Sequence, residues 1–479
     1  MTEHYQSPLA SRYASDEMSS LFSAQKKYST WRIIWLALAK AQKDLGLCIT
    51  QEQINEMEAH LEDIDFKRVE KYEKMLRHDV MAHIHTFGES CPLARPIIHL
   101  GATSCLVSDN ADVLILKEAL ELLLKKLFVL IEKLSEKAEF YKNTPCLGYT
   151  HFQAAQPTTL GKRISLWIQD ILLDISDLDY RLKNLKLLGI KGATGTQASF
   201  LDLFNGDHGK VKKLESLICK SLGFEKVFSV SAQTYSRKQD MHILDLLSGI
   251  AVTSHKMATD FRLLAHLKEL EEPFGKDQIG SSAMPYKRNP MQSERVCSLS
   301  RYVISLGENP KYTAATQWLE RTLDDSANRR LCIPEAFLAI DAIINISIYL
   351  ADGMVAYPKV MEKRLKEELP FIATESVLMA SVKKGANRQN IHERIRKHSV
   401  EVAKRLKELG LDNDLIERIA KDPEIPLSMD ELEEIFNINS FIGRAPQQVE
   451  EFLKNEVEDF FLKHEGTNME TLSPILIKN

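Results

Sequence analysis

Apolar residues recur with the period of an α-helix along three long stretches in the middle of the chain. The first begins near Ser108 or Asp109, either of which can cap a helix. The second follows Thr159 and can end at Gly189, and the third spans about 237–271. Each stretch of about thirty residues predicts a helix roughly 45 Å long, because an α-helix rises 1.5 Å per residue. Such rods bury their apolar sides best against one another, so the pattern predicts a helical bundle.

Shorter helical patterns flank this predicted bundle. Two of them follow the loop after the third long stretch, at about 290–306 and about 334–350, and would complete the bundle; Pro334 is tolerable near the start of a helix. Before about Thr103 the chain is rich in short helices and loops, and after about Tyr357 its charge density rises. These shifts predict an all-α protein of three domains: an N-terminal helical domain (1–103), a central helical bundle (104–356) and a C-terminal helical domain (357–479).

The first two stretches carry more apolar residues than one buried face requires. In the first, Leu120, Leu122, Leu123 and Leu124 follow one another almost without interruption. A helix that is apolar around much of its circumference is covered on more than one side. We therefore expect other copies of the chain to cover the outer face, which makes the protein an oligomer built through the bundle.

The composition favours long helices and a globular protein. The 20 glycines and 16 prolines are about 4% and 3% of the 479 residues, below the roughly 7% and 5% of average proteins. With 62 basic and 67 acidic residues the net charge is -5, which opposes non-specific attraction to nucleic acid or an anionic membrane. We therefore expect neither as a partner, and we expect any bound phosphate to meet a local cluster of arginines.

The seven cysteines are scattered and show no Cys-x-x-Cys spacing. They predict neither a disulfide framework nor a zinc knuckle. The N-terminus lacks a basic region followed by an apolar run, and no uncharged apolar stretch reaches 18 residues. We therefore expect reduced thiols and a cytoplasmic location.

The connection formed by residues 273–290 is longer than helical packing requires. It contains three prolines and two glycines and follows neither a helical nor an alternating pattern. Loops of this length are uncommon in compact domains and are usually functional or disordered. It carries two hydroxyls, an amine, a guanidinium and a carboxamide, from Ser281, Ser282, Lys287, Arg288 and Asn289. This inventory predicts a catalytic loop, and a flexible Gly-Ser linker is the alternative.

The string from Gly280 to Pro290, Gly-Ser-Ser-Ala-Met-Pro-Tyr-Lys-Arg-Asn-Pro, resembles the signature of the fumarase/aspartase superfamily. Its last seven residues are similar to the animal type of the adenylosuccinate lyase family. The resemblance covers nearly the whole chain, from Ser11-Arg12-Tyr13 to the segment 443–448, in the family's order. It implies a fumarase/aspartase-like fold and a homotetramer with shared active sites, and we expect neither a cofactor nor a metal.

The activity that this resemblance implies is β-elimination with cleavage of a C–N bond. Adenylosuccinate would give AMP and fumarate, and the succinyl-carboxamide imidazole ribotide (SAICAR) would give its carboxamide (AICAR) and fumarate. Both reactions are steps of purine nucleotide biosynthesis, and their substrates are small nucleotides.

His151 lies in Thr150-His151-Phe152-Gln153, just before the second long helix. Histidine titrates near neutrality, so it can give a proton to a leaving group and later release another. Taken alone, a loop histidine is more often a surface or packing residue. This string, followed by residues 155–159, is similar to the family's second motif, which implies that His151 is the general acid. The family commonly has a proline where Ala154 stands.

The resemblance assigns the catalytic base to Ser281 rather than to Ser282. A serine hydroxyl is a poor base unless its alkoxide is stabilised, and Lys287 and backbone N–H groups of the loop are candidates for this. Lys287 would also stabilise the charge that develops on the dicarboxylate, and Glu294 could orient His151. An up-down bundle could bring His151 and Ser281 together in one chain, whereas the resemblance implies that three subunits supply the three motif regions.

The resemblance also implies a set of substrate-binding residues. Thr103 and Ser104 would hold the dicarboxylate beside a helix start, with a plain helix cap as the alternative. Guanidinium groups bind phosphate strongly through paired hydrogen bonds. The nucleotide, and chiefly its phosphate, would be bound by Arg12, Tyr13, Arg321, Ser326 and Arg330. A solvated charged turn is the alternative for the last three of these. The remaining substrate contacts would come from Arg77, His78, Asp79, Gln233 and Arg295.

His78, His83 and His85 raise the alternative of a metal site. Metal ligands on one helix need a spacing of three or four, whereas these histidines are five and two residues apart. The spacing fits no common ligand arrangement. We therefore expect no metal here, and we expect His83 and His85 to pack on a helix face.

Two alternatives to the implied activity remain open. Another lyase of the superfamily, such as argininosuccinate lyase or fumarase, would share the fold, but those usually carry other residues where Tyr286 and Arg288 stand. A non-catalytic member would be expected to lack the acid, the base or the lysine. His151, Ser281 and Lys287 are all present, which favours an enzyme.

Overall fold

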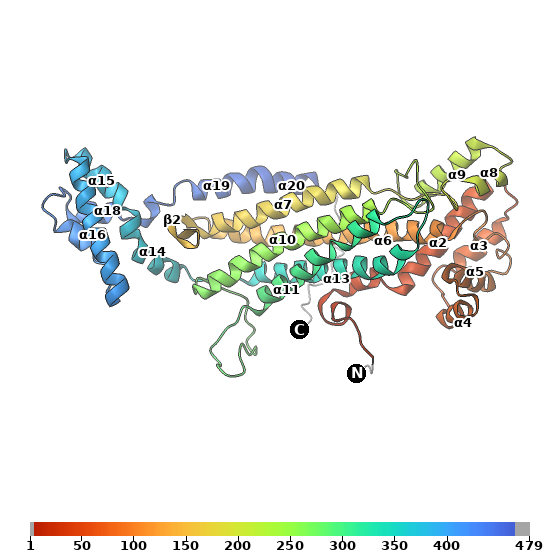
Figure 1. Cartoon of the computed structure of the whole chain (residues 1–479), viewed down its shortest axis with the longest axis horizontal. Helices are drawn as coiled ribbons and strands as arrows, with labels where there is room; N and C mark the ends of the chain where they lie inside the picture. Colours follow the sequence, from red (N-terminus) through yellow and green to blue (C-terminus); the bar gives the residue numbers. More distant parts are fainter. Residues whose placement is uncertain (1–3, 465–479) are drawn as a thin grey trace.

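In this computed structural model, which describes residues 4–464, long helices lie side by side and form a bundle (Figure 1). The bundle consists of α6 (Ser104–Phe140), α7 (Leu160–Asn184), α10 (Lys238–His266), α11 (Met291–Leu306) and α13 (Asp324–Gly353). α6 contacts α7 and α13, and α10 contacts α7, α11 and α13, so the helices surround a common core. The predicted all-α fold with a central bundle is confirmed.

Shorter helices precede, interrupt and follow the bundle. The N-terminal region contains η1 (Leu9–Tyr13), α1 (Asp16–Leu21), α2 (Ala24–Asp44), α3 (Gln51–Ala59), α4 (Phe66–Leu76) and α5 (Asp79–Ser90). Between the bundle helices lie α8 (Ala198–Leu203), α9 (His208–Ser221) and α12 (Asn309–Ala315). The C-terminal region contains α14 (Pro358–Ile372), α15 (Thr374–Lys383), α16 (Arg388–Leu409), α17 (Leu415–Ala420), α18 (Met429–Ile435), η2 (Ile438–Ser440), α19 (Ala445–Phe452), η3 (Leu453–Val457) and α20 (Glu458–Lys463). α2 is 21 residues long and packs on α6, so the N-terminal region is not limited to the short helices predicted for it.

The predicted start of the first long helix was wrong. α6 begins at Ser104 and follows Thr103, not Ser108 or Asp109. Asp109 is not a helix cap, because it is buried inside the helix and accepts hydrogen bonds from Arg237. A tertiary ion pair therefore determines the role of this aspartate, and local sequence does not reveal it.

Two further helix limits differ from the prediction. α7 ends at Asn184, and Gly189 lies in the following loop with a φ of 80°. A side chain at Gly189 would collide with the carboxylate of Glu215, so this glycine allows a close approach rather than a helix end. α13 begins at Asp324, with acidic residues in its first turn that favour a helix N-terminus, and Pro334 lies inside the helix.

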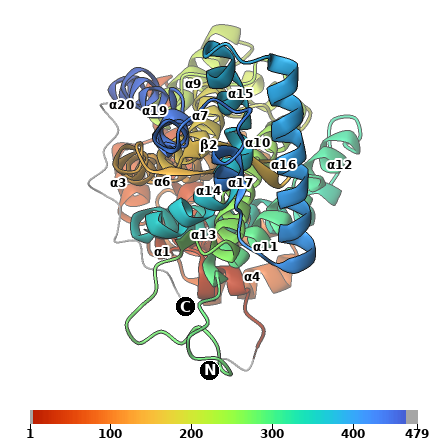
Figure 2. The ribbon, with the colours of Figure 1, turned by 90° about the vertical axis from the view of Figure 1, so that its left-hand side faces the viewer.

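Two short pairs of strands interrupt the helices. β1 (Pro145–Thr150) and β2 (Gln153–Thr159) form an antiparallel hairpin between α6 and α7. β3 (Leu270–Glu271) pairs with β4 (Val355–Ala356), and β3 takes the last residues of a stretch predicted as helical. From β3 the chain continues to α11 through a segment that projects from the helices in both ribbon views (Figures 1 and 2).

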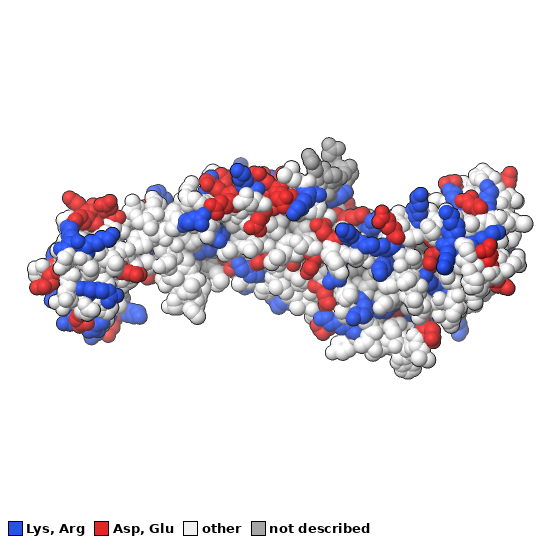
Figure 3. Space-filling model, turned by 90° about the horizontal axis from the view of Figure 1, so that it is seen from above, with Lys and Arg blue, Asp and Glu red and all other residues white. Residues whose placement is uncertain are grey.

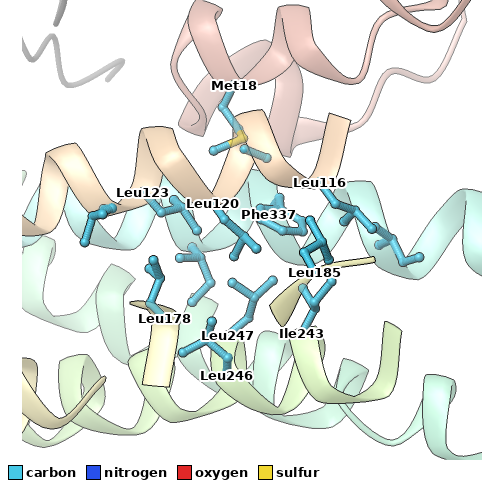
Figure 4. Close-up of a cluster of buried hydrophobic side chains, with 14 of the residues drawn as sticks. Met18, Leu116, Leu120, Leu123, Leu178, Leu185, Ile243, Leu246, Leu247 and Phe337 are labelled. Carbon is cyan, nitrogen blue, oxygen red and sulfur yellow. The ribbon is translucent and has the colours of Figure 1, made fainter. Parts of the chain in front are cut away.

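The buried apolar side chains form one large core and one smaller core. The large core lies between the bundle helices and includes Leu120, Leu178, Leu247 and Phe337 (Figure 4). The smaller core lies among the helices from α14 to α18. α20 returns to the bundle, where Phe460 stacks on Phe128 with ring centroids 4.6 Å apart. The predicted domain limits, 103 and 356, stay predictions.

α13 is long and apolar enough to cross a membrane by length and composition alone. However, 83% of its most apolar window is buried inside the molecule. Burial among the other bundle helices accounts for its composition. On the face shown in Figure 3, Lys and Arg are interspersed with Asp and Glu, in line with the small net charge.

A buried ion pair joins the N-terminal segment to two bundle helices. Nζ of Lys126 in α6 lies 2.5 Å from Oδ1 of Asp341 in α13, and both side chains are at most 3% exposed. Ser15 completes the group, because its backbone N–H donates to Asp341 and its hydroxyl accepts from Lys126. This group anchors the chain directly after η1.

Replacing Lys126 by Met is expected to reduce the free energy of unfolding by about 3–5 kcal/mol, because Asp341 would remain buried without its partner. Urea denaturation followed by circular dichroism measures this change. The double variant Lys126→Met/Asp341→Asn should recover part of the loss, and Lys213→Met on the exposed side of α9 should lose almost nothing. An unchanged midpoint for Lys126→Met would contradict the role of the pair.

Candidate active site

His151 lies at the tip of the β1–β2 hairpin and is exposed, rather than lying directly before a helix. Thr150 pairs with Gln153, so His151 and Phe152 are the two turn residues, and their φ angles are 52° and 55°. Two-residue hairpins with positive φ normally contain Asn and Gly. Non-glycine residues in this region cost about 1–3 kcal/mol each and concentrate at functional sites. The backbone thus marks His151 as a candidate functional residue.

The loop after β3 is attached to the molecule by two neighbouring glutamates. Glu272 accepts hydrogen bonds from the backbone N–H groups of Gln292 (3.0 Å) and Ser293 (2.6 Å), and thereby caps α11. Glu271 Oε2 accepts from Arg288 Nη1 at 2.9 Å and from the hydroxyl of Tyr357 at 2.8 Å. The two ends of the loop are therefore held together while its middle projects.

Inside the loop, Ser281 is surrounded by backbone donors. Its Oγ accepts from the N–H groups of Ala283 (3.3 Å) and Met284 (3.2 Å). Such donors stabilise negative charge on an oxygen. Lys287 follows on the exposed part of the loop, and a side chain at Gly280 would lie 2.1 Å from the carbonyl oxygen of Lys287, so only glycine allows this folding of the loop.

A second group of predicted site residues meets at the opposite end of the long helices. Ser104 opens α6, and the next residue, Cys105, donates from Sγ to Oε1 of Gln233 at 3.6 Å. The backbone N–H of Gln233 donates to the carbonyl oxygen of Glu320 at 3.2 Å, directly before Arg321. The structure therefore brings Thr103, Ser104, Gln233, Arg321 and Ser326 into one region from three parts of the chain.

Arg77, His78 and Asp79 connect α4 to α5 beside this region. Arg77 has a φ of 53° and ends α4, and Nδ1 of His78 accepts the backbone N–H of Met81 at the start of α5. Asp79 Oδ2 lies 3.1 Å from Nη2 of Arg330. The predicted phosphate ligand Arg330 and the predicted triplet are thus in direct contact.

Lys27 on α2 is a candidate that sequence reasoning missed. Burial lowers the pKa of Lys27, Arg330 and Arg329 lower it further, and Asp112 and Asp79 oppose them. Its Nζ lies 5.4 Å from the ring centroids of the neighbouring aromatic residues 28 and 31. The helical pattern of α2 gave no signal for it, because its role depends on distant charges.

Tyr13 and Arg295 form a third group. The guanidinium carbon of Arg295 lies 5.6 Å from the ring centroid of Tyr13, which joins η1 to α11. Arg12 is exposed next to this contact, and Glu294 is exposed in the first turn of α11. The two predicted nucleotide contacts from the N-terminus therefore lie near α11, to which the loop that contains Ser281 leads.

A buried ion network lies behind the region of Gln233 and Arg321. Arg237 donates to both oxygens of Asp109 at 2.9 and 3.2 Å, and its Nε donates to Asp325 at 2.7 Å. Arg329 pairs with Asp240 at 2.7 Å in the same network. Burial lowers the pKa of Arg237, but Asp109 and its other acidic neighbours outweigh this and raise the pKa above its usual range. Sequence reasoning missed this network, since these charges are far apart along the chain.

The chain separates these groups by the length of its helices. α6 has 37 residues, so about 55 Å lie between Ser104 and the end of the helix that leads to His151. Within residues 4–464 no hydrogen bond or ion pair joins His151 to Ser281, Lys287 or Glu294. One chain therefore does not bring the predicted acid together with the predicted dicarboxylate-binding residues.

The histidines near α5 have packing roles. His83 is 3% exposed and its ring stacks on Tyr28 at 3.8 Å, and His85 stacks on Tyr72 at 5.2 Å. The prediction that both pack on a helix face is confirmed. In the described part of the chain no group of three or more His, Cys, Asp or Glu side chains has a metal-binding arrangement.

Comparisons with known proteins agree with the fold. The family described as Lyase matches residues 12–305, and the family described as Adenylosuccinate lyase C-terminus matches residues 370–452. The 3-carboxy-cis,cis-muconate lactonizing enzyme from Pseudomonas putida has a similar structure, with a TM-score of 0.81, 21% identity and coverage of 93% of this chain and 98% of that chain. The fumarate lyase from Mesorhizobium sp. BNC1 is also similar, with a TM-score of 0.79, 22% identity and coverage of 95% of this chain and 100% of that chain. At such identities the likeness shows the fold alone, and together with the first family it defines a lyase of the fumarase/aspartase superfamily.

Several curated relatives are much more similar in sequence. Proteins named adenylosuccinate lyase from Saccharomyces cerevisiae, Schizosaccharomyces pombe and Schistosoma mansoni are 52%, 51% and 50% identical to this chain over 460, 456 and 459 residues. Each alignment covers 95% of both chains. The chain belongs to the adenylosuccinate lyase family, and the resemblance found in its motifs is confirmed.

Acid is expected to destabilise the protein through His83. Burial, assisted by Arg32, lowers the pKa of His83 from 6.5 to about 4. Between these values the unfolded chain binds a proton that the folded chain excludes, so the free energy of unfolding falls as the pH falls from 6.5 to 4. The slope for one such histidine is up to about 1.4 kcal/mol per pH unit. Urea midpoints at pH 7 and pH 5 measure it.

Two histidine variants separate this effect from general acid sensitivity. His83→Gln should show a smaller loss of stability between pH 7 and pH 5 than the wild type. His85→Gln, the same substitution two residues further along α5, should lose as much stability between pH 7 and pH 5 as the wild type. If the wild type and His83→Gln lost the same stability between pH 7 and pH 5, His83 would not be the source of the acid sensitivity.

Proposed function

We propose that this protein eliminates fumarate from adenylosuccinate, giving AMP, and from SAICAR, giving AICAR. The observation that carries the proposal is the identity of 50–52% to curated adenylosuccinate lyases over nearly the full length of the chain. His151, Ser281 and Lys287, the acid, base and charge-stabilising residue that the family motifs imply, are all present. The cytoplasmic location expected from the sequence stays a prediction.

In the proposed reaction Ser281 acts as the base. Its oxygen removes the proton from the carbon next to a carboxylate of the succinyl group, and the electron pair left on that carbon forms the C=C bond of fumarate as the C–N bond breaks. The N–H groups of Ala283 and Met284 support this role, because they point at Oγ and stabilise it when it is deprotonated. Lys287 stabilises the negative charge that develops on the carboxylate.

His151 acts as the acid and protonates the departing nitrogen. Its position at an exposed hairpin tip supports this role, because there the imidazole can reach a substrate held by other parts of the assembly. Positioned acids and bases typically contribute about 10² to 10⁴ in rate each. Glu294, which would orient His151, lies in the first turn of α11 near the catalytic loop.

The substrate would lie between the catalytic residues and the region around α13. Thr103 and Ser104 would hold the dicarboxylate beside the start of α6. The nucleotide, and chiefly its phosphate, would be bound by Arg12, Tyr13, Arg321, Ser326 and Arg330. The remaining substrate contacts would come from Arg77, His78, Asp79, Gln233 and Arg295. The meeting of Gln233 with the segment before Arg321, and of Asp79 with Arg330, supports a common binding region.

We further propose a homotetramer whose active sites are shared between subunits. The separation of about 55 Å along α6 supports sharing, because a single chain holds the acid far from Ser104. Exposed apolar residues support assembly through the bundle. On α7, Leu166, Leu173 and Tyr180 are 42%, 64% and 58% exposed and recur every seven residues, so they form one apolar stripe.

A spectroscopic assay of fumarate release tests the activity. The wild-type protein is expected to release fumarate from adenylosuccinate and not from argininosuccinate. Turnover of argininosuccinate alone would place the protein in another branch of the superfamily. No turnover of either substrate by the intact oligomer would refute the enzymatic function.

Mixing two inactive variants tests the sharing of active sites. His151→Ala and Ser281→Ala are each expected to lose activity by at least about 10². After subunit exchange in equal amounts, about one quarter of the sites should combine a native His151 with a native Ser281, if these come from different subunits. Fumarate release should then recover to a similar fraction. No recovery despite exchange proven by mass spectrometry would count against shared sites.

Introducing a charge into the apolar stripe of α7 tests the tetramer. Leu173→Glu is expected to weaken assembly and to reduce activity in parallel, because the interface would have to bury a carboxylate. Sedimentation velocity measures the oligomeric state. Leu409→Glu on α16 is a matched control, since Leu409 is 65% exposed and Leu173 is 64% exposed. A fully active Leu173→Glu tetramer would remove this stripe from the interface.

A further inference from the structure

Asp325 occupies an unusual position between two arginines in the first turn of α13. Its side chain is fully buried, and each of its oxygens has a different guanidinium partner. Oδ2 accepts from Nε of Arg237 at 2.7 Å, and Oδ1 accepts from Nη1 of Arg321 at 2.8 Å. One carboxylate thus joins a buried arginine to a partly exposed one.

The two arginines differ in what else they contact. The side chain of Arg237 is 2% exposed, and its Nη1 and Nη2 both donate to Asp109. The side chain of Arg321 is 22% exposed, and besides Asp325 its Nη1 donates to the carbonyl oxygen of Thr322. Within residues 4–464 no group accepts a hydrogen bond from Nε or Nη2 of Arg321. These two atoms form one edge of the guanidinium, which is the shape that binds a phosphate through paired hydrogen bonds.

The charge on Asp325 is secured by the same contacts. Burial alone would raise the pKa of Asp325, but Arg237 and Arg321 outweigh it and hold the pKa below its ordinary value. Asp325 is therefore a carboxylate at neutral pH. Arg237 holds it from the buried side through the network with Asp109, so Asp325 has little freedom to follow Arg321.

We propose that Asp325, held in place by Arg237, is a positioning residue that orients the free edge of Arg321 toward the phosphate of the nucleotide. Asp325 does not touch the substrate. It restrains Nη1 of Arg321, so the side chain does not have to lose its rotational freedom when the nucleotide binds. This inference rests on the proposed function, because Arg321 is one of the phosphate ligands proposed for that activity.

A positioning role and a purely electrostatic role of Asp325 have opposite effects on phosphate binding. A carboxylate near a phosphate repels it, so neutralising Asp325 should strengthen phosphate binding if the carboxylate acted only through its charge. If Asp325 instead positions Arg321, neutralising it should weaken phosphate binding. The direction of the change therefore distinguishes the two roles.

The test measures inhibition of the intact enzyme by its two products. In Asp325→Asn we expect the inhibition constant of AMP and the KM of adenylosuccinate to rise about tenfold, since hydrogen bonds to charged groups have this strength. The inhibition constant of fumarate, which carries no phosphate, and kcat should change less than about twofold. Asp324→Asn, one residue earlier and exposed, removes the same charge and should leave all four constants within about twofold of the wild type.

Arg237→Lys provides a second variant if Asp325→Asn does not fold. Lysine keeps the buried charge but has no fork that reaches Asp109 and Asp325 together. Arg237→Lys should also raise the inhibition constant of AMP more than that of fumarate. Thermal melting and sedimentation establish that each variant is folded and assembled before its constants are compared.

The outcomes separate this inference from the proposed function. A wild-type protein that releases no fumarate from adenylosuccinate refutes the proposed function itself. An active wild type with unchanged or tighter AMP inhibition in Asp325→Asn, or in Arg237→Lys where that variant is the folded one, refutes the positioning role alone. An equal rise in the inhibition constants of AMP and fumarate also refutes the positioning role, because it indicates general damage to the structure.

Discussion

The buried ion network at the starts of α6, α10 and α13 is the interaction on which the rest of the structure depends. Asp109, Arg237 and Asp325 are 2%, 3% and 1% exposed, and buried charges are tolerated only when each has a well-placed partner. Because each helix contributes one of these charges, the three helices have one favourable arrangement. The segments that carry Ser104, Gln233 and Arg321 come directly before these charges, and the network therefore fixes one end of the candidate site.

The other end of the candidate site is held in a different way. His151 lies on an exposed two-residue turn, and Ser281 lies on a loop whose base is held by Glu271 and Glu272. The loop of Ser281 projects from the helices, which is typical of regions with low local stability. α14 packs along β1 and β2, so the hairpin is supported by its own chain up to the exposed turn at His151. The proposed binding residues thus depend on burial, whereas the proposed acid and base depend on local backbone geometry. In the proposed tetramer, other subunits supply further contacts to the loop of Ser281 and to the exposed turn at His151.

Much of the fold could be predicted from the sequence, because burial imposes the helical period on every long bundle helix. The errors arose where distant residues decide a local role. Asp109 has the sequence signal of a helix cap but is part of an ion pair with a residue 128 positions later. The hairpin was missed because His151 and Phe152 are not typical turn residues. The candidate catalytic residues were found through the family motifs, whereas Lys27 and the buried network have no motif of their own.

The length of α6 has a consequence for how this protein can vary. Inserting one residue would move everything beyond it by 1.5 Å and rotate it by about 100°, because an α-helix has 3.6 residues per turn. The hairpin at the end of α6 would then present His151 in a wrong direction. In the proposed shared site, the length of α6 sets the distance between His151 and the dicarboxylate-binding residues of the same chain, so the number of residues in α6 is constrained. Surface loops set no such distance, so we expect insertions and deletions to be tolerated there rather than within α6.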